Sequence, residues 1–209
     1  TELEDQETFR KARGILNKLT PEKFEKLAIE FCYIKIRNPK VLRNIIVLIL
    51  EKALNEPHYS ALYAQLCQRL DRCVPNFEPH APPLTHPDQQ QPPQITTFRK
   101  LLITVCQHEF DNRANYADSD ELQKQFQLQQ QQQFNSGEEE KNAAIEYIKQ
   151  IAKKKMLGNV KFIGELGKLD LLSKAILHKC IKTLLEKQKD EKYADMADDL
   201  ECLCKMMTT

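Results

Sequence analysis

Four side chains in the C-terminal third of the sequence are of the types that bind zinc. His178, Cys180, Cys202 and Cys204 together offer one imidazole and three thiolates, a ligand set found in structural zinc sites. Each pair, however, has a single intervening residue within a helical pattern, and neighbours two apart on a helix point about 200° from each other. Such pairs do not easily close one tetrahedral site. We therefore expect no metal site and no other bound cofactor.

Three of the five glycines lie in a segment that superficially resembles a phosphate-binding loop. Five residues separate Gly158 from Gly164, and Gly167 is followed by Lys168 and Leu169. A P-loop instead has four residues between its glycines, then Lys and Ser or Thr, directly after a strand. We interpret these glycines as positions that let a neighbouring helix approach closely, and we expect a kink in the helix at Gly158.

The sequence contains no recognisable catalytic constellation. His58, His80, His86 and His108 lack partner residues at a recognisable spacing, and no nucleophile motif is present. Adjacent acids such as Asp198-Asp199 are more typical of solvated charges at a helix start than of acid–base machinery. The sequence therefore predicts a protein that is not an enzyme.

Basic residues gather in two places, although the whole chain has a net charge of only +1. One group lies around the first helical pattern and comprises Arg10, Lys11, Arg13 and Lys18. The other comprises Lys149, Lys153, Lys154, Lys155 and Lys161. Lysines without interleaved aromatic residues are more typical of a solvated face than of a nucleic-acid groove. We retain the second group as candidate RNA-binding residues, because with balanced charge any nucleic-acid contact must be local.

The composition favours a helical, soluble protein. A chain of 209 residues is long enough to bury a sizeable core, and 5 Gly with no Trp make a turn-rich β fold unfavourable. No apolar run approaches the roughly 20 residues that span a bilayer. Seven scattered cysteines, an odd number, argue against a secreted disulfide framework. We expect reduced thiols, a cytoplasmic location and no membrane contact.

Apolar residues recur at helical spacing and predict eight helices, or four hairpins. The stripes begin at Phe9, Phe24, Val41, Tyr59, Phe98, Ala144, Leu172 and Leu200. Candidate N-caps are Thr20, Asn38, Thr96 and Ser173. Pro21 and Pro57 lie 36 residues apart, each between two helices. This weak repeat is typical of stacked helical hairpins, as in HEAT and tetratricopeptide arrays.

Two stretches interrupt the helical pattern. Residues 74–94 are rich in Pro, His and Gln, and residues 113–140 are rich in Gln. Neither composition can pack a core. We expect one solenoid domain over residues 1–209 with these two segments looped out. Because the last apolar stripe runs to Thr208-Thr209 without a Gly, Asn or Pro terminator, we also expect that the domain is truncated at its C-terminus.

Five separated motifs together resemble, in the same order, the middle domain of the translation initiation factor 4 gamma family. They are Ile15-Leu-Asn-Lys-Leu-Thr-Pro-Glu-Lys-Phe24, Glu51-Lys-Ala-Leu-Asn-Glu-Pro57, Phe98-Arg-Lys-Leu-Leu102, Leu157-Gly-Asn-Val-Lys-Phe-Ile-Gly-Glu-Leu166 and Leu200-Glu-Cys-Leu-Cys204. Two further stretches, 164–171 and 176–187, are most similar to the branch of the family that does not depend on the cap. The resemblance implies an all-α, right-handed HEAT-repeat solenoid of about five hairpins, of which four fall in this chain.

The same resemblance implies a partner and a site. In this family the domain docks the DEAD-box RNA helicase initiation factor 4A and holds its two lobes ready to close on ATP and RNA, which is a population shift without chemistry on the scaffold. The turn of the first hairpin contributes to that contact, so the implied helicase-binding residues are Asn17, Lys18, Leu19, Thr20, Pro21, Lys23 and Phe24. We expect a monomer, with other initiation factors and RNA as further candidate partners. The alternative is a generic HEAT-type interaction or RNA-binding platform in another assembly.

Overall fold

The computed structural model describes residues 2–77, 96–112, 138–185 and 204, and these residues contain helices and no strand. The α-helices in this part of the chain are α1 (Glu2–Leu16), α2 (Phe24–Cys32), α3 (Pro39–Asn55), α4 (Ser60–Cys73), α5 (Thr97–Asp111), α7 (Glu138–Lys168) and α8 (Lys174–Leu185). Two 3₁₀ turns, η1 (Pro21–Lys23) and η2 (Pro57–Tyr59), lie within the first two hairpins. The predicted eighth helix lies outside the described residues, apart from Cys204.

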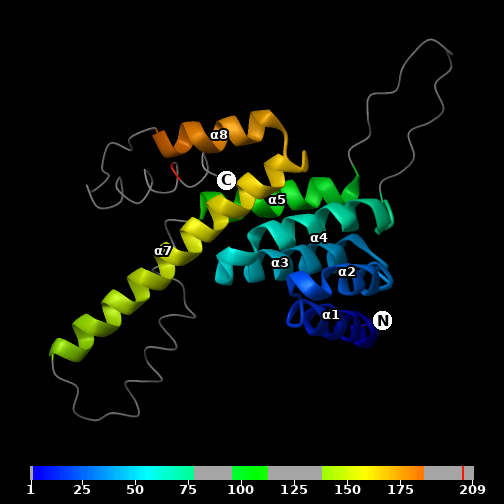
Figure 1. Ribbon diagram of the computed structural model, residues 1–209, viewed down its shortest axis with the longest axis horizontal. Helices are drawn as coiled ribbons and strands as arrows, with labels where there is room; N and C mark the ends of the chain where they lie inside the picture. Colours follow the sequence, from blue (N-terminus) through cyan, green and yellow to red (C-terminus); the bar gives the residue numbers. More distant parts are fainter. Residues whose placement is uncertain (1, 78–95, 113–137, 186–203, 205–209) are drawn as a thin grey trace.

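The helices stack as antiparallel hairpins, α1 with α2 and α3 with α4, and α5, α7 and α8 follow along the same stack (Figure 1). Helix α3 is central, because it packs against α1, α4, α5 and α7. Nine of its 17 residues are buried, including Leu42, Ile45 and Ile46 at 0% exposure. Its apolar stripe is therefore covered on more than one side, and the all-α solenoid expected from the sequence is confirmed.

Side-chain caps begin three of the helices, as the sequence predicts. Asn38 Oδ1 accepts a hydrogen bond from the Val41 N–H at 2.8 Å, and Thr96 Oγ1 accepts one from the Arg99 N–H at 3.1 Å. Ser173 Oγ lies 3.4 Å from the Ile176 N atom at the start of α8. Each cap satisfies one of the N–H groups that a helix start leaves unpaired.

Thr20 does not cap the second helix, so that prediction is wrong. Its side chain makes no capping hydrogen bond, and Pro21 begins η1 rather than an α-helix. The hydroxyl instead interacts with the Glu22 carboxylate. Hydrogen bonds from the Glu22 backbone and from Thr20 lower the pKa of that carboxyl group.

Helix α7 runs through Gly158 without interruption, so the predicted kink is wrong (Figure 1). The glycine serves close packing instead: a Cβ atom at this position would lie 2.8 Å from the Leu54 carbonyl oxygen and 3.1 Å from the Leu54 Cα atom of α3. Further along α7, a Cβ atom at Gly167 would lie 2.6 Å from Leu177 Cδ1 of α8. The interpretation as points of close helix approach is confirmed for Gly158 and Gly167, and it stays a prediction for Gly164.

Helix α7 ends in a left-handed residue that α5 helps to hold. Asp170 has φ of 55°, and the Leu171 N–H reaches back to the Leu166 carbonyl at 3.0 Å, the bond pattern of a Schellman cap. Arg99 Nη1 donates to the Asp170 carbonyl at 3.1 Å and Nε donates to Asp71 of α4 at 2.8 Å. One guanidinium therefore ties three elements of the stack together.

The two predicted insertions fall largely on residues outside the described part of the chain, 78–95 and 113–137. The beginning of the first is described and is held against α5: Asn76 Oδ1 accepts from the Thr97 N–H at 3.1 Å, and the Phe77 N–H donates to Thr97 Oγ1 at 2.9 Å. The composition places the end of the second at residue 140, but α7 begins at Glu138. Its last three residues are therefore helical.

A disulfide joins Cys32 to Cys73, with the two Cα atoms 5.8 Å apart, so the expectation of reduced thiols is wrong for this pair. Cys67 and Cys106 are buried thiols, as expected. Burial raises the pKa of both, that of Cys106 to about 12, which makes these thiols inert at neutral pH.

Candidate functional site

The turn between α1 and α2 is fixed by its own backbone hydrogen bonds. The Asn17 N–H donates to the Arg13 carbonyl at 3.0 Å, and the N–H groups of Lys18 and Leu19 donate to the carbonyls three residues earlier, at 3.0 and 3.2 Å. These bonds tighten the last turn of α1 and satisfy carbonyls that a helix end leaves open. The side chains on this turn therefore sit on an ordered backbone.

Apolar side chains beneath the turn anchor it to the core. Leu16 is 1% exposed, Leu19 is 3% exposed and Phe24 is 6% exposed. Two of the seven implied helicase-binding residues, Leu19 and Phe24, thus place their side chains in the core. Their position lets them support the turn rather than present a contact surface.

The polar residues of the same turn face solvent. Asn17, Lys18, Pro21 and Lys23 are exposed, and Thr20 is half-buried. Among the described residues neither Lys18 nor Lys23 takes part in an ion pair, although other exposed cations do, such as Lys11 with Glu7 at 2.9 Å. The structure therefore brings four of the seven implied residues together as an exposed surface with two lysines beside the exposed Glu22, which we call the α1–α2 turn surface.

The five candidate RNA-binding lysines do not share one face of α7. Lys154 is exposed, Lys153, Lys155 and Lys161 are half-buried, and the side chain of Lys149 lies outside the described part. Because residues seven apart lie on the same side of a helix, Lys154 and Lys161 point the same way, about 10 Å apart along the axis. Lys153 and Lys155 point about 100° to either side of Lys154.

An exposed tyrosine, absent from the sequence-based candidates, lies on the same face as Lys154 and Lys161. Tyr147 is 62% exposed and lies seven residues before Lys154. The spacing 147, 154, 161 is the signal that could have found it. We call these three residues the α7 face.

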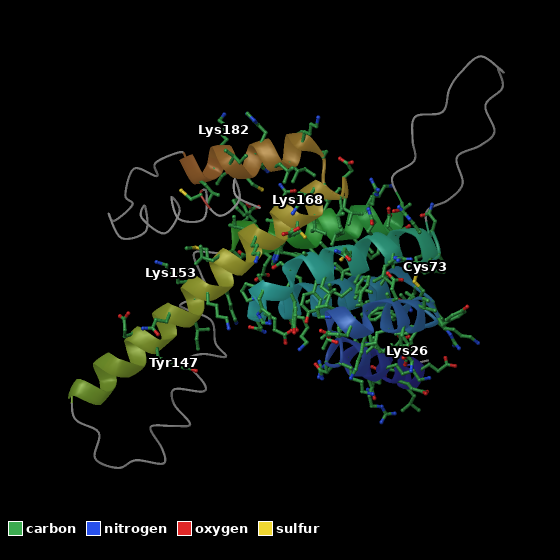
Figure 2. The ribbon with its side chains drawn as sticks, viewed as in Figure 1. Lys26, Cys73, Tyr147, Lys153, Lys168 and Lys182 are labelled. Atoms are coloured by element: carbon green, nitrogen blue, oxygen red, sulfur yellow. A yellow bond between two sulfur atoms is a disulfide. The ribbon has the colours of Figure 1, made fainter. Side chains whose placement is uncertain are left out.

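The α1–α2 turn surface and the α7 face lie in different regions of the molecule. Figure 2 shows Tyr147 and Lys153 on the part of α7 that projects from the stack, far from Lys26 on α2.

The four zinc-type side chains considered from the sequence are not seen together as one site. His178 is exposed, Cys180 is buried and Cys202 lies outside the described residues. Within the described ranges no three His, Cys, Asp or Glu side chains are grouped as metal ligands. No helix in those ranges is long and apolar enough to cross a membrane.

Known proteins with similar sequences are translation initiation factors. The chain is 52% identical over 201 residues to eukaryotic translation initiation factor 4 gamma 2 of Homo sapiens, a match that covers 96% of this chain and 20% of that protein. It is 37% identical to factor 4 gamma 1 of Mus musculus and to factor 4 gamma 3 of Homo sapiens, covering 98% and 99% of this chain and 12% of each of those proteins. The higher identity to factor 4 gamma 2, the paralogue also called death-associated protein five, fits the similarity expected to the non-cap-dependent branch.

A solved structure has the same fold. The crystal structure of the MIF4G domain of Trypanosoma cruzi translation initiation factor EIF4G5 superposes with a TM-score of 0.58 at 21% identity, covering 95% of this chain and 77% of that one. The family model of the MIF4G domain matches residues 9–209. This chain, which spans about a fifth of factor 4 gamma 2, belongs to the MIF4G domain family of the translation initiation factor 4 gamma proteins.

Proposed function

We propose that this chain is the middle domain of a cytoplasmic translation-initiation scaffold, and that it docks the DEAD-box helicase initiation factor 4A through the α1–α2 turn surface. The proposal assigns the domain to cap-independent or alternative initiation, with no chemistry of its own. The observation that supports it most directly is the exposed pair Lys18 and Lys23 on a turn whose backbone and buried side chains are fixed. Family membership supports the choice of partner.

A rigid turn suits a scaffold that acts on the conformation of its partner. A scaffold shifts the equilibrium of a two-lobed enzyme only by the difference in its affinity for the two lobe arrangements. An ordered turn preserves this difference in affinity, because binding does not have to order the turn first. The two ammonium groups would face carboxylates of the helicase, since neither Lys18 nor Lys23 forms an ion pair among the described residues of this chain. Lys23 lies close enough to Glu22 to help lower the pKa of that carboxyl group.

The double substitution Lys18→Glu with Lys23→Glu tests this placement. We expect it to weaken binding of purified initiation factor 4A at least tenfold, or about 1.4 kcal/mol, in an isothermal titration. Exposed charge reversals usually change stability by less than about 0.5 kcal/mol, so the thermal midpoint should barely move.

The matched control is Lys35→Glu with Lys40→Glu, the same charge change on an exposed lysine between α2 and α3 and an exposed lysine in the first turn of α3. This control should bind the helicase as the native chain does. Equal binding by the native chain and a folded Lys18/Lys23 variant would place the helicase contact elsewhere. If both double variants lost the same helicase affinity, the loss would come from the change in overall charge and not from a contact at the α1–α2 turn surface.

The α7 face favours RNA as a second partner. An exposed aromatic ring with two lysines on one helix face combines a stacking surface with phosphate contacts. We expect Lys154→Glu with Lys161→Glu to lower the salt slope of RNA binding by about 2, because each substitution removes one ammonium group that neutralises a phosphate. Tyr147→Ala should weaken binding at every salt concentration without changing that slope. A native chain that shows no RNA binding at low salt would exclude this second role.

A further inference from the structure

The disulfide between Cys32 and Cys73 links the last residue of α2 to the last residue of α4. The two helices pack side by side, so the bond ties together the same ends of neighbouring hairpins. Cys32 is half-buried and Cys73 is exposed, at the edge of the stack in Figure 2. One sulfur of the bond is therefore within reach of a solute thiol.

A cavity of about 300 Å³ lies against this bond. Its lining residues are Ala28, Ile29, Cys32, Tyr33, Arg69 and Cys73. Two of them are large apolar side chains left exposed, Ile29 at 53% and Tyr33 at 82%. The cavity therefore offers apolar walls, a disulfide and one guanidinium, and it is large enough for a small peptide-like molecule.

Arg69 has N–H groups at the cavity that can donate hydrogen bonds to a bound molecule. Its Nη2 atom donates to both carboxylate oxygens of Glu25, at 2.8 and 2.9 Å, and its side chain is 47% exposed. Within the described part of the chain the Nε and Nη1 groups make no further hydrogen bond. Those groups can receive a carboxylate of a bound molecule, the ligand for which a guanidinium is best shaped.

We propose that the Cys32–Cys73 pair is a reversible thiol–disulfide exchange site for a small anionic thiol of the glutathione class, which docks in this cavity with a carboxylate on Arg69. Disulfides in reducing compartments are usually transient or redox-sensing, and exposed ones are the labile kind. The inference rests on the cytoplasmic location in the proposed function and not on helicase binding.

The exchange proceeds in two balanced steps. The thiolate of one glutathione attacks Cys73 Sγ, a glutathione–Cys73 disulfide forms, and Cys32 leaves as a thiolate that takes a proton. A second glutathione thiolate then attacks the glutathione sulfur of that mixed disulfide. Glutathione disulfide forms and Cys73 leaves as a thiolate. Two glutathione molecules supply the two electrons, and glutathione disulfide reverses both steps.

The decisive measurement is the rate at which glutathione reduces the oxidised chain, followed by maleimide trapping of thiols and mass spectrometry. We expect Arg69→Ala to slow reduction by glutathione about fivefold, the effect of one close charge pair in a water-exposed site, and to leave reduction by neutral 2-mercaptoethanol unchanged. Arg69→Lys should retain most of the native rate. Arg43→Ala, which removes an exposed arginine of α3 outside the cavity, should retain all of it. Equal slowing of glutathione and 2-mercaptoethanol in Arg69→Ala, or no slowing of either, would overturn the docking role of Arg69.

A second measurement tests the order of attack without depending on Arg69. Glutathione disulfide should add one glutathione to Cys73 in Cys32→Ser, and it should modify Cys32 in Cys73→Ser at least fivefold more slowly, because Cys32 is half-buried. Circular dichroism establishes that each variant is folded. A folded Cys32→Ser chain that takes up no glutathione, or a native bond that survives millimolar glutathione while dithiothreitol reduces it, would refute the exchange site.

Discussion

The two proline joints of the first half of the chain, η1 and η2, share a backbone hydrogen bond and have opposite surroundings. In η1 the Phe24 N–H donates to the Pro21 carbonyl, and in η2 the Ser60 N–H donates to the Pro57 carbonyl. All three residues of η1 are exposed, whereas in η2 Pro57 and Tyr59 are half-buried and the following Ser60 is 0% exposed. Helix α7 packs against η2 and covers it. We call η2 with the preceding Glu56 the covered joint, and η1 the open joint.

The covered joint has a partly buried hydrogen-bond network, whereas the charged side chains of the open joint are exposed. Glu56, just before η2, accepts hydrogen bonds from Lys52 Nζ at 2.8 Å and from the Tyr63 hydroxyl. At the open joint Lys18 and Lys23 are exposed to solvent. The same type of turn, repeated along a solenoid, can therefore become part of the core or remain an exposed surface. The outcome depends on whether a later helix packs on it, as α7 packs on η2.

The largest change in stability should come from Gly158→Val, which forces α7 away from Leu54, at the end of α3 beside the covered joint. The glycine has no room for a Cβ atom because the Leu54 backbone lies 2.8 Å from that position, so we expect the free energy of unfolding to fall by about 1–3 kcal/mol in urea denaturation. Gly14→Ala is the control, since nothing lies within 4 Å of its Cβ position in α1. It should raise the free energy of unfolding by about 0.5–1 kcal/mol. Equal effects at the two glycines would refute the close contact.

A smaller loss should follow removal of the charge at the centre of the network, with Glu56→Gln. Burial tends to raise the pKa of Glu56, but the hydrogen bonds from Lys52 and Tyr63 outweigh it and hold the pKa below its ordinary value of 4.5. The carboxylate therefore stabilises the fold above pH 4.5, and that contribution disappears as the pH falls through the lowered pKa. We expect Glu56→Gln to cost about 1–2 kcal/mol at neutral pH and to unfold at nearly the native urea midpoint in acid.

A double-substitution cycle with Tyr63→Phe sharpens this prediction. Because the tyrosine hydroxyl donates to Glu56, the two substitutions should not be additive, and the double variant should lose less than the sum of the single losses. Additive losses would mean that the hydroxyl and the carboxylate stabilise the joint independently.

The smallest effect should be a gain, from Ser60→Ala at the beginning of α4. Ser60 Oγ is buried and has no hydrogen-bond partner within the part of the chain that the structure describes. Removing it relieves an unsatisfied polar atom and adds helix propensity, so the free energy of unfolding should rise by about 0.5–1 kcal/mol. A loss of similar size would show that the hydroxyl is hydrogen-bonded in solution.

The helices and their starts could be predicted because they depend on near neighbours in sequence. Apolar spacing located each described helix, and the caps at Asn38, Thr96 and Ser173 each bond to an N–H group three residues later. Thr20 has the same residue type as Thr96 and fails as a cap, because the turn after it is a 3₁₀ turn and its hydroxyl meets Glu22. Residue type alone could not distinguish these two threonines.

The features that sequence reasoning missed depend on residues far apart in the chain. Cys32 and Cys73 are 41 residues apart and meet only because α2 stacks beside α4, so a count of cysteines could not pair them. The kink expected at Gly158 follows from local helix propensity, which the close packing on Leu54 overrides. The division of the α1–α2 turn into buried Leu19 and Phe24 and exposed lysines could be anticipated from the core stripes, and helicase binding by that turn stays a prediction.

The close approach of Leu54 and Gly158 sets an order of folding during synthesis. The two residues are separated by about 100 residues, and a ribosome that adds about 5–20 residues per second needs on the order of 5–20 s to reach the second after the first. The hairpins α1–α2 and α3–α4 rest on contacts close in sequence and can form within that interval. Until α7 emerges, the apolar face of α3 that it covers stays open to water and to other nascent chains, and the covered joint behaves like the open one.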